Sequence, residues 1–348
     1  MFVALRDLRA ARGRFALITL VVVLVAILVS FLSGLTSGLA HQNVSALRKI
    51  SGDTVVFADT GTAPSFDSSA LTADQVRAWR QAAPADPVGI SRARATRDGG
   101  PPVQVALFGS EGATFGNRSA TSTGSVVLSA PAARNLSATA GDHIMLGNAT
   151  FVVAAVGDDD WYAHTPVVWT TLPDWRALTP HGGAATILVT SGVPDASAVN
   201  AAAHTVTTSA SDSLRAIGSY RAEHSSLTLM TILLYAISAL VIGAFFTVWT
   251  IQRSPDIAIL KALGATTGSL VADALGQALI VLLTGVGIGL AITSAAGTAL
   301  DTAMPFVLSA ATTLAPGAAL IALGLLGAAV ALRFVATADP LTALDRTR

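Results

Sequence analysis

Residues 220–230 hold the side chains of this chain that are best suited to bind a ligand. Tyr220, Arg221, Glu223, His224 and Met230 occur there, at the start of a long apolar run. Such side chains can coordinate a metal, pair with an anion or line an apolar wall. The same residue types are common where a helix enters a membrane, as interfacial anchors, snorkelling charges and packing residues. Residue type alone therefore leaves both interpretations open.

Enzymatic chemistry has few candidate residues elsewhere in the 348-residue sequence. The chain contains no Cys, which excludes disulfides, thiolate metal sites and Cys nucleophiles. Its six His residues are scattered, and none has the spacing of a zinc site. Asp158, Asp159 and Asp160 form an acidic run that we interpret as a solvated turn, with a cation site as the alternative. No G-x4-G-K-S/T motif occurs, so we expect neither a catalytic nor an intrinsic metal site here, and ATP binding only in another chain.

Four apolar helices are the elements that must position these residues. Charged residues make up 12% of the chain and the mean hydropathy is +0.62, which is typical of a membrane protein. A membrane-spanning helix needs about 20 apolar residues. Runs of this kind predict transmembrane helices at residues 15–38, 226–251, 270–296 and 314–335. The first run is too long for the apolar core of a signal peptide, so we expect it to remain uncleaved.

Residues 40–225 form a polar insertion between the first two of these helices. They are rich in Ser, Thr, Asp, Gly and Pro, which is typical of a domain with many turns. The local patterns predict strands at 53–58, 103–108 and 125–128, a hairpin at 143–156 that turns at Gly147 and Asn148, and short helices at 71–81 and 130–138. The predicted fold class is therefore a membrane α-helical protein of four transmembrane helices, with a large α+β domain inserted between helices 1 and 2.

The distribution of basic residues sets the expected orientation. Lys and Arg occur in residues 1–14, in residues 252–269 and in the tail 336–348, whereas the loop 297–313 has none. Because short cytoplasmic segments carry an excess of Lys and Arg, both termini and residues 252–269 are expected in the cytoplasm. Residues 40–225 and 297–313 are then expected outside. The net charge of zero gives no indication of a nucleic-acid partner.

Two local patterns concern how the helices meet each other and a partner. Gly285 and Gly289 have the spacing that lets two helices pack closely in lipid, although Gly is also simply common in membrane helices. The cytoplasmic segment 252–269 contains a short amphipathic helix that can dock in a groove of a soluble partner, or lie at the membrane surface as a plain anchor. Its candidate coupling residues are Pro255, Asp256, Ile259, Leu260, Lys261, Leu263 and Gly264.

The sequence of this segment resembles a family signature. IQRSPDIAILKALGAT, at residues 251–266, is similar to the stretch between the second and third spans of MacB/FtsX-type permeases of ABC transporters. ADPLTAL, at 338–344, resembles the ending typical of that family. The resemblance implies a multi-pass protein of a bacterial plasma membrane. It also implies a second copy of the permease and two copies of a cytoplasmic ATPase subunit that holds ATP and Mg, with no tightly bound cofactor in this chain.

Four further runs resemble the heme-efflux permeases of that family, the HrtB subgroup. They are RFALITLVVVLVAILVSFLSGLTSGL at 14–39, WYAHTPVV at 161–168, SYRAEHSSLTLM at 219–230 and AMPFVL at 303–308. The resemblance implies heme as the transported ligand. Heme iron accepts Tyr, His, Met or carboxylate ligands, and an Arg can pair with a propionate. The candidate heme-binding residues are Tyr220, Arg221, Glu223, His224, Met230, Tyr162, His164 and Met304.

Two parts of this interpretation stay open at the level of sequence. Residues 59–124 match the family pattern poorly, so the fold details of that part are not predicted. The alternatives to heme export are an ATP-driven mechanotransmission scaffold of the FtsX type, which transports nothing, and an exporter of lipoproteins or drugs. A ligand-lined rim would favour a transporter, and an exposed docking patch without a rim would favour a scaffold.

Overall fold

The structure is a computed structural model. It describes residues 12–97, 99–111, 114–115, 120, 122–180, 182–193, 195–252, 259, 261–300 and 304–336. The chain divides into two compact units. Residues Leu39–Ser225 form a β-rich domain, and the described residues up to Gly38 and from Ser226 onward form a helical unit. The division falls inside α2 (Arg12–Val44) and α8 (Gly218–Gln252), which are continuous helices.

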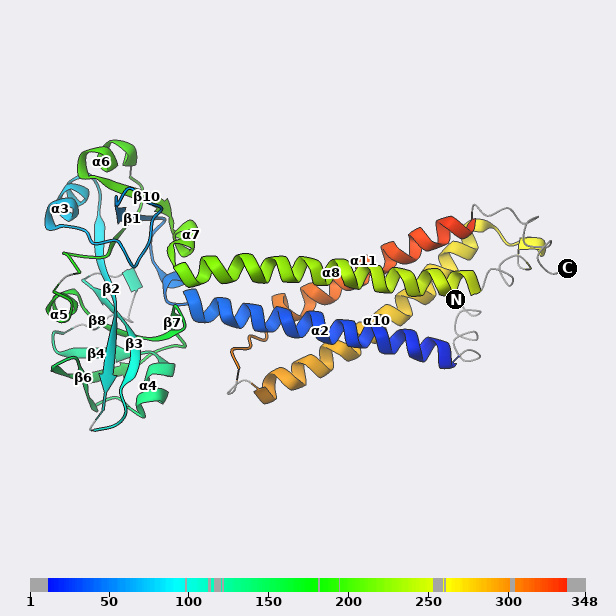
Figure 1. Cartoon of the computed structure of the whole chain (residues 1–348), viewed down its shortest axis with the longest axis horizontal. Coiled ribbons are helices and arrows are strands. Elements are labelled where there is room, and N and C mark those ends of the chain that lie inside the picture. The colour runs from blue at the N-terminus through cyan, green and yellow to red at the C-terminus, as the bar shows by residue number, and fades with distance from the viewer. Residues whose placement is uncertain are drawn as a thin grey trace. The chain divides into compact units, whose positions relative to one another are not determined.

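The helical unit contains four helices that are long and apolar enough to cross a bilayer. They are α2, α8, α10 (Thr267–Leu300) and α11 (Ala310–Ala336), labelled in Figure 1. The predicted spans 15–38, 226–251, 270–296 and 314–335 each lie within one of these helices. Every helix extends beyond its predicted span, because an α-helix satisfies its own backbone hydrogen bonds and need not end where hydropathy falls.

The glycines of α10 form a close contact with α2. A Cβ atom at Gly285 would lie 2.7 Å from Val22, and one at Gly289 would lie 2.6 Å from Ala26. The Gly285–Gly289 spacing therefore has a packing role, as one of the two interpretations predicted. Because the contacts advance by four residues on both helices in the same direction, α2 and α10 run parallel to each other.

The connection between α10 and α11 folds back onto α2. The ring of Phe306 packs against Gly34 and Gly297, where a Cβ would clash with it, and lies 5.3 Å from the ring of Phe31. The backbone N–H of Val307 donates to the carbonyl of Gly34 at 3.2 Å. This connection is therefore packed against the helices, and the part of it outside the described residues is 301–303.

The β-rich domain is built on one ten-stranded sheet in the order β10-β1-β9-β2-β3-β8-β4-β6-β5, with β7 paired to β8. The end of the long strand β2 also pairs with β5, so six strands form a closed circuit. The strands are β1 (Thr54–Ala58), β2 (Ala85–Thr96), β3 (Val103–Ser110), β4 (Ser125–Leu128), β5 (His143–Leu146), β6 (Ala149–Val156), β7 (Trp161–Tyr162), β8 (Thr165–Thr171), β9 (Ile187–Thr190) and β10 (Thr205–Ser209).

Short helices cover this sheet and begin at polar caps. Thr72 forms a reciprocal capping box with Gln75 at the start of α3, and Ser129 caps α4. Figure 1 shows α3 and α6 near the β1–β10 end of the sheet and α4 near its other end. The helices and helical turns are α3 (Ala73–Ala82), α4 (Ala130–Leu136), α5 (Leu172–Leu178), α6 (Ala196–Ala203), α7 (Ala210–Ser213), η1 (Leu47–Lys49) and η3 (Leu214–Ala216).

Candidate ligand site at the start of α8

The C-terminal end of α2 is capped by the turn between β7 and β8. The backbone N–H of Ala163 donates to the carbonyl of Asn43 at 3.0 Å, and that of His164 donates to the carbonyl of Gln42 at 2.9 Å. These bonds satisfy carbonyls that a helix end leaves without partners. Ala163 and His164 have φ values of 46° and 61°, a left-handed conformation that costs free energy in residues other than Gly. The turn is therefore held in a strained shape against the end of α2.

Asn43 connects this turn to the first turns of α8. Its side chain is 1% exposed. The Oδ1 atom accepts a hydrogen bond from the Ser219 hydroxyl at 2.6 Å, and Nδ2 donates to Glu223 Oε2 at 2.8 Å and to the Leu39 carbonyl at 3.2 Å. Gln42, Asn43, His164, Ser219 and Glu223 are called the Asn43 cluster below. All five lie within the β-rich domain.

His164 and Glu223 face each other inside the Asn43 cluster. The Nε2 atom of His164 lies 2.8 Å from Glu223 Oε1, and the two side chains are 32% and 36% exposed. The same Nε2 atom lies 3.0 Å from Asn43 Nδ2, so its contact with Glu223 is a hydrogen bond when the proton is on Nε2. Two of the predicted heme-binding residues, which are 59 positions apart, thus meet directly.

Tyr220 and His224 form a stacked pair on α8. Their ring centroids are 5.2 Å apart and their planes differ by 23°. They are four residues apart, so they project from the same face of the helix. Tyr220 packs partly against the core of the domain, while Arg221 and His224 are exposed. A phenol, an imidazole and a guanidinium are therefore available on one and a half turns of helix.

The remaining predicted binding residues lie elsewhere. Tyr162 is 3% exposed, and its ring packs edge-to-face against Phe66 and Phe108 in the core of the β-rich domain. Met230 is 56% exposed on α8, and Met304 is 38% exposed beside the packed Phe306 segment. Both methionines belong to the helical unit. The structure therefore brings together the polar candidates on α8 and His164, and it does not bring Tyr162 into the Asn43 cluster.

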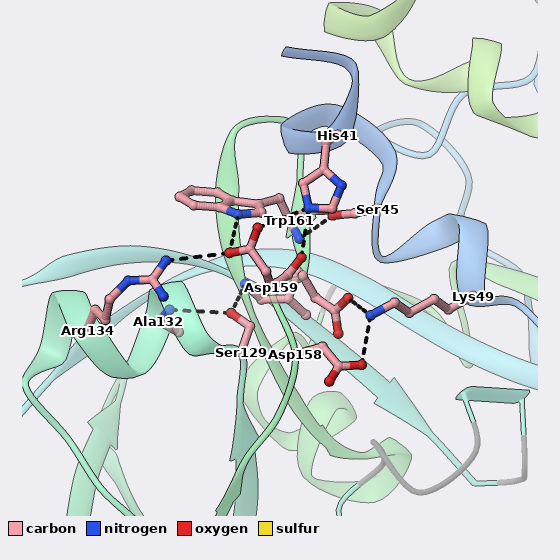
Figure 2. A network of polar contacts seen from close by, with 11 residues as sticks. His41, Ser45, Lys49, Ser129, Ala132, Arg134, Asp158, Asp159 and Trp161 are labelled. Atoms are coloured by element: carbon pink, nitrogen blue, oxygen red, sulfur yellow. Dashed lines mark hydrogen bonds and ion pairs between the residues drawn. The ribbon is translucent and has the colours of Figure 1, made fainter. Parts of the chain in front are cut away.

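The acidic run was predicted to be a solvated turn, which holds for Asp158 and Asp159, whose side chains are 59% and 54% exposed, and is wrong for Asp160. Asp160 is fully buried and forms an ion pair with Lys49. Lys49 also contacts Asp158 at 3.1 Å (Figure 2). A carboxylate can be buried when a cation pairs with it. Lys49 comes from η1, 111 positions away in sequence, so the local sequence gave no indication of the pairing. Among the described residues there is no group of three or more His, Cys, Asp or Glu that could hold a metal ion.

Asp159 ties the same loop to α2. Its Oδ2 atom lies 3.0 Å from His41 Nε2, and its Oδ1 atom accepts from Trp161 Nε1 at 3.2 Å and faces Arg134 at 3.5 Å (Figure 2). The hydrogen bond from His41 is the main reason that the pKa of Asp159 lies below its usual value. Ser45 adds a further link, because its hydroxyl accepts from the backbone N–H of Trp161 at 2.8 Å.

Sequence reasoning missed the residues that organise this site. Ser219 was quoted only as part of a motif, and His41, Gln42 and Asn43 were not singled out. The available signal was the QNVS stretch directly after the first apolar run, where a polar Asn must find partners if it is buried. No sequence pattern could show that its partners lie 121, 176 and 180 positions away.

The predicted coupling residues are described in part. Ile259 is 60% exposed and Leu263 is 79% exposed, and Gly264 has a φ of 97°, which suits its predicted place at the end of a helix. Lys261 is half-buried. Pro255, Asp256 and Leu260 lie outside the described residues. Two large apolar side chains are thus exposed in this segment without a partner inside the described part of the chain.

Two family models match this chain and together identify its family. A model described as the MacB-like periplasmic core domain matches residues 15–209, which is more than half of the chain, and one described as the FtsX-like permease C-terminal matches residues 213–340. The chain belongs to the MacB/FtsX-type permease family. The four apolar helices and the β-rich domain are consistent with a multi-pass membrane permease of this family.

Several curated relatives are similar to this permease. A protein of Staphylococcus epidermidis named as a hemin transport system permease protein, HrtB, is 29% identical over 197 residues, covering 56% of this chain and 55% of the relative. A protein of Staphylococcus haemolyticus with the same name is 37% identical over 128 residues, covering 37% of this chain and 36% of the relative. The chain spans about half the length of the curated relatives that it matches.

A solved structure also shows a likeness. The periplasmic region of MacB from Actinobacillus actinomycetemcomitans has 13% identity and a TM-score of 0.36, covering 48% of this chain and 94% of that chain.

Proposed function

We propose that this permease is the membrane subunit of an ATP-driven ABC exporter that extrudes heme from the outer leaflet of a bacterial plasma membrane. A separate cytoplasmic ATPase supplies the energy, and two copies of the permease assemble with two copies of that ATPase. The β-rich domain lies outside the cytoplasm and the segment 252–269 lies inside, as the distribution of basic residues predicts.

The observation that carries the heme proposal is the meeting of His164 and Glu223 beside Tyr220 and His224. Imidazole, carboxylate and phenolate groups are ligand types for heme iron, and Arg221 is exposed on the same helix to pair with a propionate. Relatives that are named as hemin transport permeases add independent support. Tyr162, Met230 and Met304 stay as predictions outside this set.

Some contacts of the Asn43 cluster must open when heme binds, and others can remain. His164 Nε2 is occupied by its contact with Glu223, so iron can bind this nitrogen only if that contact opens. Glu223 would retain the hydrogen bond from Asn43 Nδ2 at 2.8 Å, which keeps the carboxylate in place. Tyr220 and His224 are not engaged with Glu223 in this way, so they can bind a ligand without breaking the cluster.

The continuity of α8 supports a mechanical role. The helix contains 35 residues from Gly218 to Gln252 with no proline, which corresponds to about 50 Å at 1.5 Å per residue. A helix without a break transmits an axial or tilting displacement along its length. We propose that the ATPase pushes on the exposed Ile259 and Leu263 and that α8 carries the motion to the residues around Tyr220.

The burial of α8 supports a second copy. In its most apolar window 17% of the residues are buried inside the chain, against 33% to 39% for the other three helices. Its outer half also carries Thr228, a polar side chain that is exposed. We propose that this half of α8 faces the second permease, where small and polar residues can pack across helices.

A heme titration of the purified permease tests the proposal. We expect a saturable shift of the Soret band on adding hemin to the detergent-solubilised chain, weakened in the His164→Ala, Glu223→Gln double variant and in Tyr220→Phe. His143→Ala and Glu111→Gln in the same domain are matched controls that should bind normally. Heme binding at this site is refuted if the spectrum of the mixture equals the sum of the spectra of free hemin and free protein. It is also refuted if the variants bind hemin as the wild type does. Additive spectra would also favour the mechanotransmission scaffold over an exporter of heme.

A further inference from the structure

A cavity of about 440 Å³ opens in the β-rich domain, away from the residues assigned above to heme. It is formed by the segment 66–70, the strand β2 and the residues that follow α5. Its walls include Phe66, Asp67, Ser68, Arg92, Tyr162 and Thr179. Ligand pockets of small molecules commonly have volumes of about 300–1,000 Å³, so this cavity is at the small end of that range.

The side chain of Tyr162 forms part of the cavity lining. Tyr162 is 3% exposed, and its ring is fixed between Phe66 and Phe108 at centroid distances of 6.1 and 5.4 Å. The side chain lines the cavity, and its hydroxyl is not one of the fully buried polar atoms that lack a partner, which is consistent with a hydroxyl that is open to the cavity. Burial also raises the pKa of Tyr162, so the group remains a phenol that can donate a hydrogen bond.

The wall of the cavity carries two opposite charges that are only loosely paired. Arg92 Nη2 lies 3.8 Å from Asp67 Oδ1, which is too long for a hydrogen bond. The two side chains are 61% and 62% exposed, so each keeps free hydrogen-bonding capacity. Asp67, Arg92 and Tyr162 all line the same cavity. Phe66 and Ile90 add apolar surface to the wall, which also includes the hydroxyl residues Ser68, Ser69, Ser91, Thr179 and Thr186.

We propose that this cavity binds a small zwitterion of amino-acid size that carries an apolar group. The ligand carboxylate accepts hydrogen bonds from Arg92 and from the Tyr162 hydroxyl, and its ammonium group donates to Asp67. The apolar group packs against Phe66 and Ile90. A purely anionic ligand is disfavoured by the carboxylate of Asp67, and a purely cationic ligand by the guanidinium of Arg92, so the two charges together select a molecule that carries both.

This site is separate from the one proposed for heme. None of its lining residues belongs to the Asn43 cluster or to the α8 residues named above. Tyr162 was predicted from sequence as a heme contact, and the zwitterion site assigns its hydroxyl a different ligand. The proposal therefore stands whether or not the chain transports heme. It gives the β-rich domain a small-molecule site of its own.

Calorimetric titration of the full chain in detergent tests the site with three probes. L-Phenylalanine carries both charges and an apolar group, 3-phenylpropionate lacks the ammonium group, and 2-phenylethylamine lacks the carboxylate. We expect saturable binding of L-phenylalanine and at least about tenfold weaker binding of each analogue, since each loses a charge-assisted hydrogen bond. This comparison needs no variant and is independent of any effect of mutation on folding.

Two variants then locate the binding. Arg92→Gln is expected to weaken L-phenylalanine binding about tenfold, and Tyr162→Phe, which keeps the buried ring, about threefold to fivefold. Arg94→Gln, two residues along the same strand and outside the cavity lining, is the matched control and should bind as the wild type does. The proposal is overturned if L-phenylalanine shows no saturable heat up to its solubility limit. It is equally overturned if an analogue binds as tightly, or if both Arg92→Gln and Tyr162→Phe leave the affinity unchanged.

Discussion

Removing the side chain of Asn43 tests how the end of α2, the β7–β8 turn and the start of α8 are held together. In Asn43→Ala, the Ser219 hydroxyl loses its acceptor at 2.6 Å and Glu223 loses its donor at 2.8 Å. A neutral hydrogen bond contributes about 1 kcal/mol net. The bond to Glu223 is charge-assisted, but that residue is 36% exposed, so we assign it also about 1 kcal/mol. The expected loss of local stability is about 2 kcal/mol.

Hydrogen exchange measured by mass spectrometry reports this loss directly. The amide protons of Ala163 and His164 are protected by the carbonyls at the end of α2, so they exchange only when the cluster opens. A loss of about 2 kcal/mol makes this opening roughly 30-fold more frequent. Peptides that cover residues 159–166 should therefore exchange about 30-fold faster in Asn43→Ala than in the wild type. Asn43→Asp should be more severe, because it sets a second carboxylate beside Glu223.

A matched control separates the cluster from general destabilisation. Asn200 also makes two side-chain hydrogen bonds within the same domain, to Thr205 and Thr207 at 2.9 Å each. Asn200→Ala should speed exchange in α6 and β10 and leave residues 159–166 unchanged. If Asn43→Ala leaves the exchange of 159–166 unchanged, or if Asn200→Ala accelerates it equally, the turn is not held by Asn43 and the reasoning is refuted.

Three further predictions follow from single contacts. The hydrogen bond from His41 lowers the pKa of Asp159 from its usual 3.8, so the ionised carboxylate stabilises the fold above about pH 4. This contribution is lost as the pH falls through the lowered pKa. The melting temperature of Asp159→Asn should therefore depend less on pH between about 5 and 3 than that of the wild type. Gly289→Val should lower the fraction of monodisperse protein in detergent, because a Cβ at this position would lie 2.6 Å from Ala26 of α2. Gly287→Val is the control and should behave as the wild type, because a Cβ there has no atom within 4 Å. Equal behaviour of the two variants would contradict the packing of α10 against α2. Leu263→Asp should abolish co-purification of a cytoplasmic ATPase. Its melting temperature should stay unchanged, because the Leu263 side chain is 79% exposed. Normal co-purification would place the coupling contact elsewhere.

Local patterns predicted the elements whose shape is decided by neighbouring residues. The hairpin β5–β6 turns at Gly147, whose φ of 59° is available to Gly at little cost, and the strands on both sides alternate between buried and exposed residues. The four apolar helices were visible for a similar reason, because hydropathy over about 20 residues is a local property. In contrast, β2 was missed, since Pro87, Arg92 and Arg94 interrupt its apolar pattern.

The sequence predicted which residue types form the candidate site, and it did not predict which residues contact one another there. Tyr220, Glu223 and His224 could be singled out from the residues before the second span, but their partners are set by contacts between distant parts of the chain. The tight β7–β8 turn is the clearest case, because Ala163 and His164 adopt positive φ without Gly, Asn or Asp. Tertiary hydrogen bonds to α2 favour this conformation, and no local signal encodes them.

The capping of α2 by the β7–β8 turn has a consequence for how this region can change in evolution. An α-helix rotates by about 100° per residue. One residue inserted or deleted between the membrane span and Asn43 would therefore turn that side chain away from Ser219 and Glu223 and would also shift the carbonyls that the turn caps. Point substitutions on the exposed side of this stretch should be tolerated, whereas changes in its length should not. Homologous chains are expected to vary freely in composition here while keeping the number of residues constant.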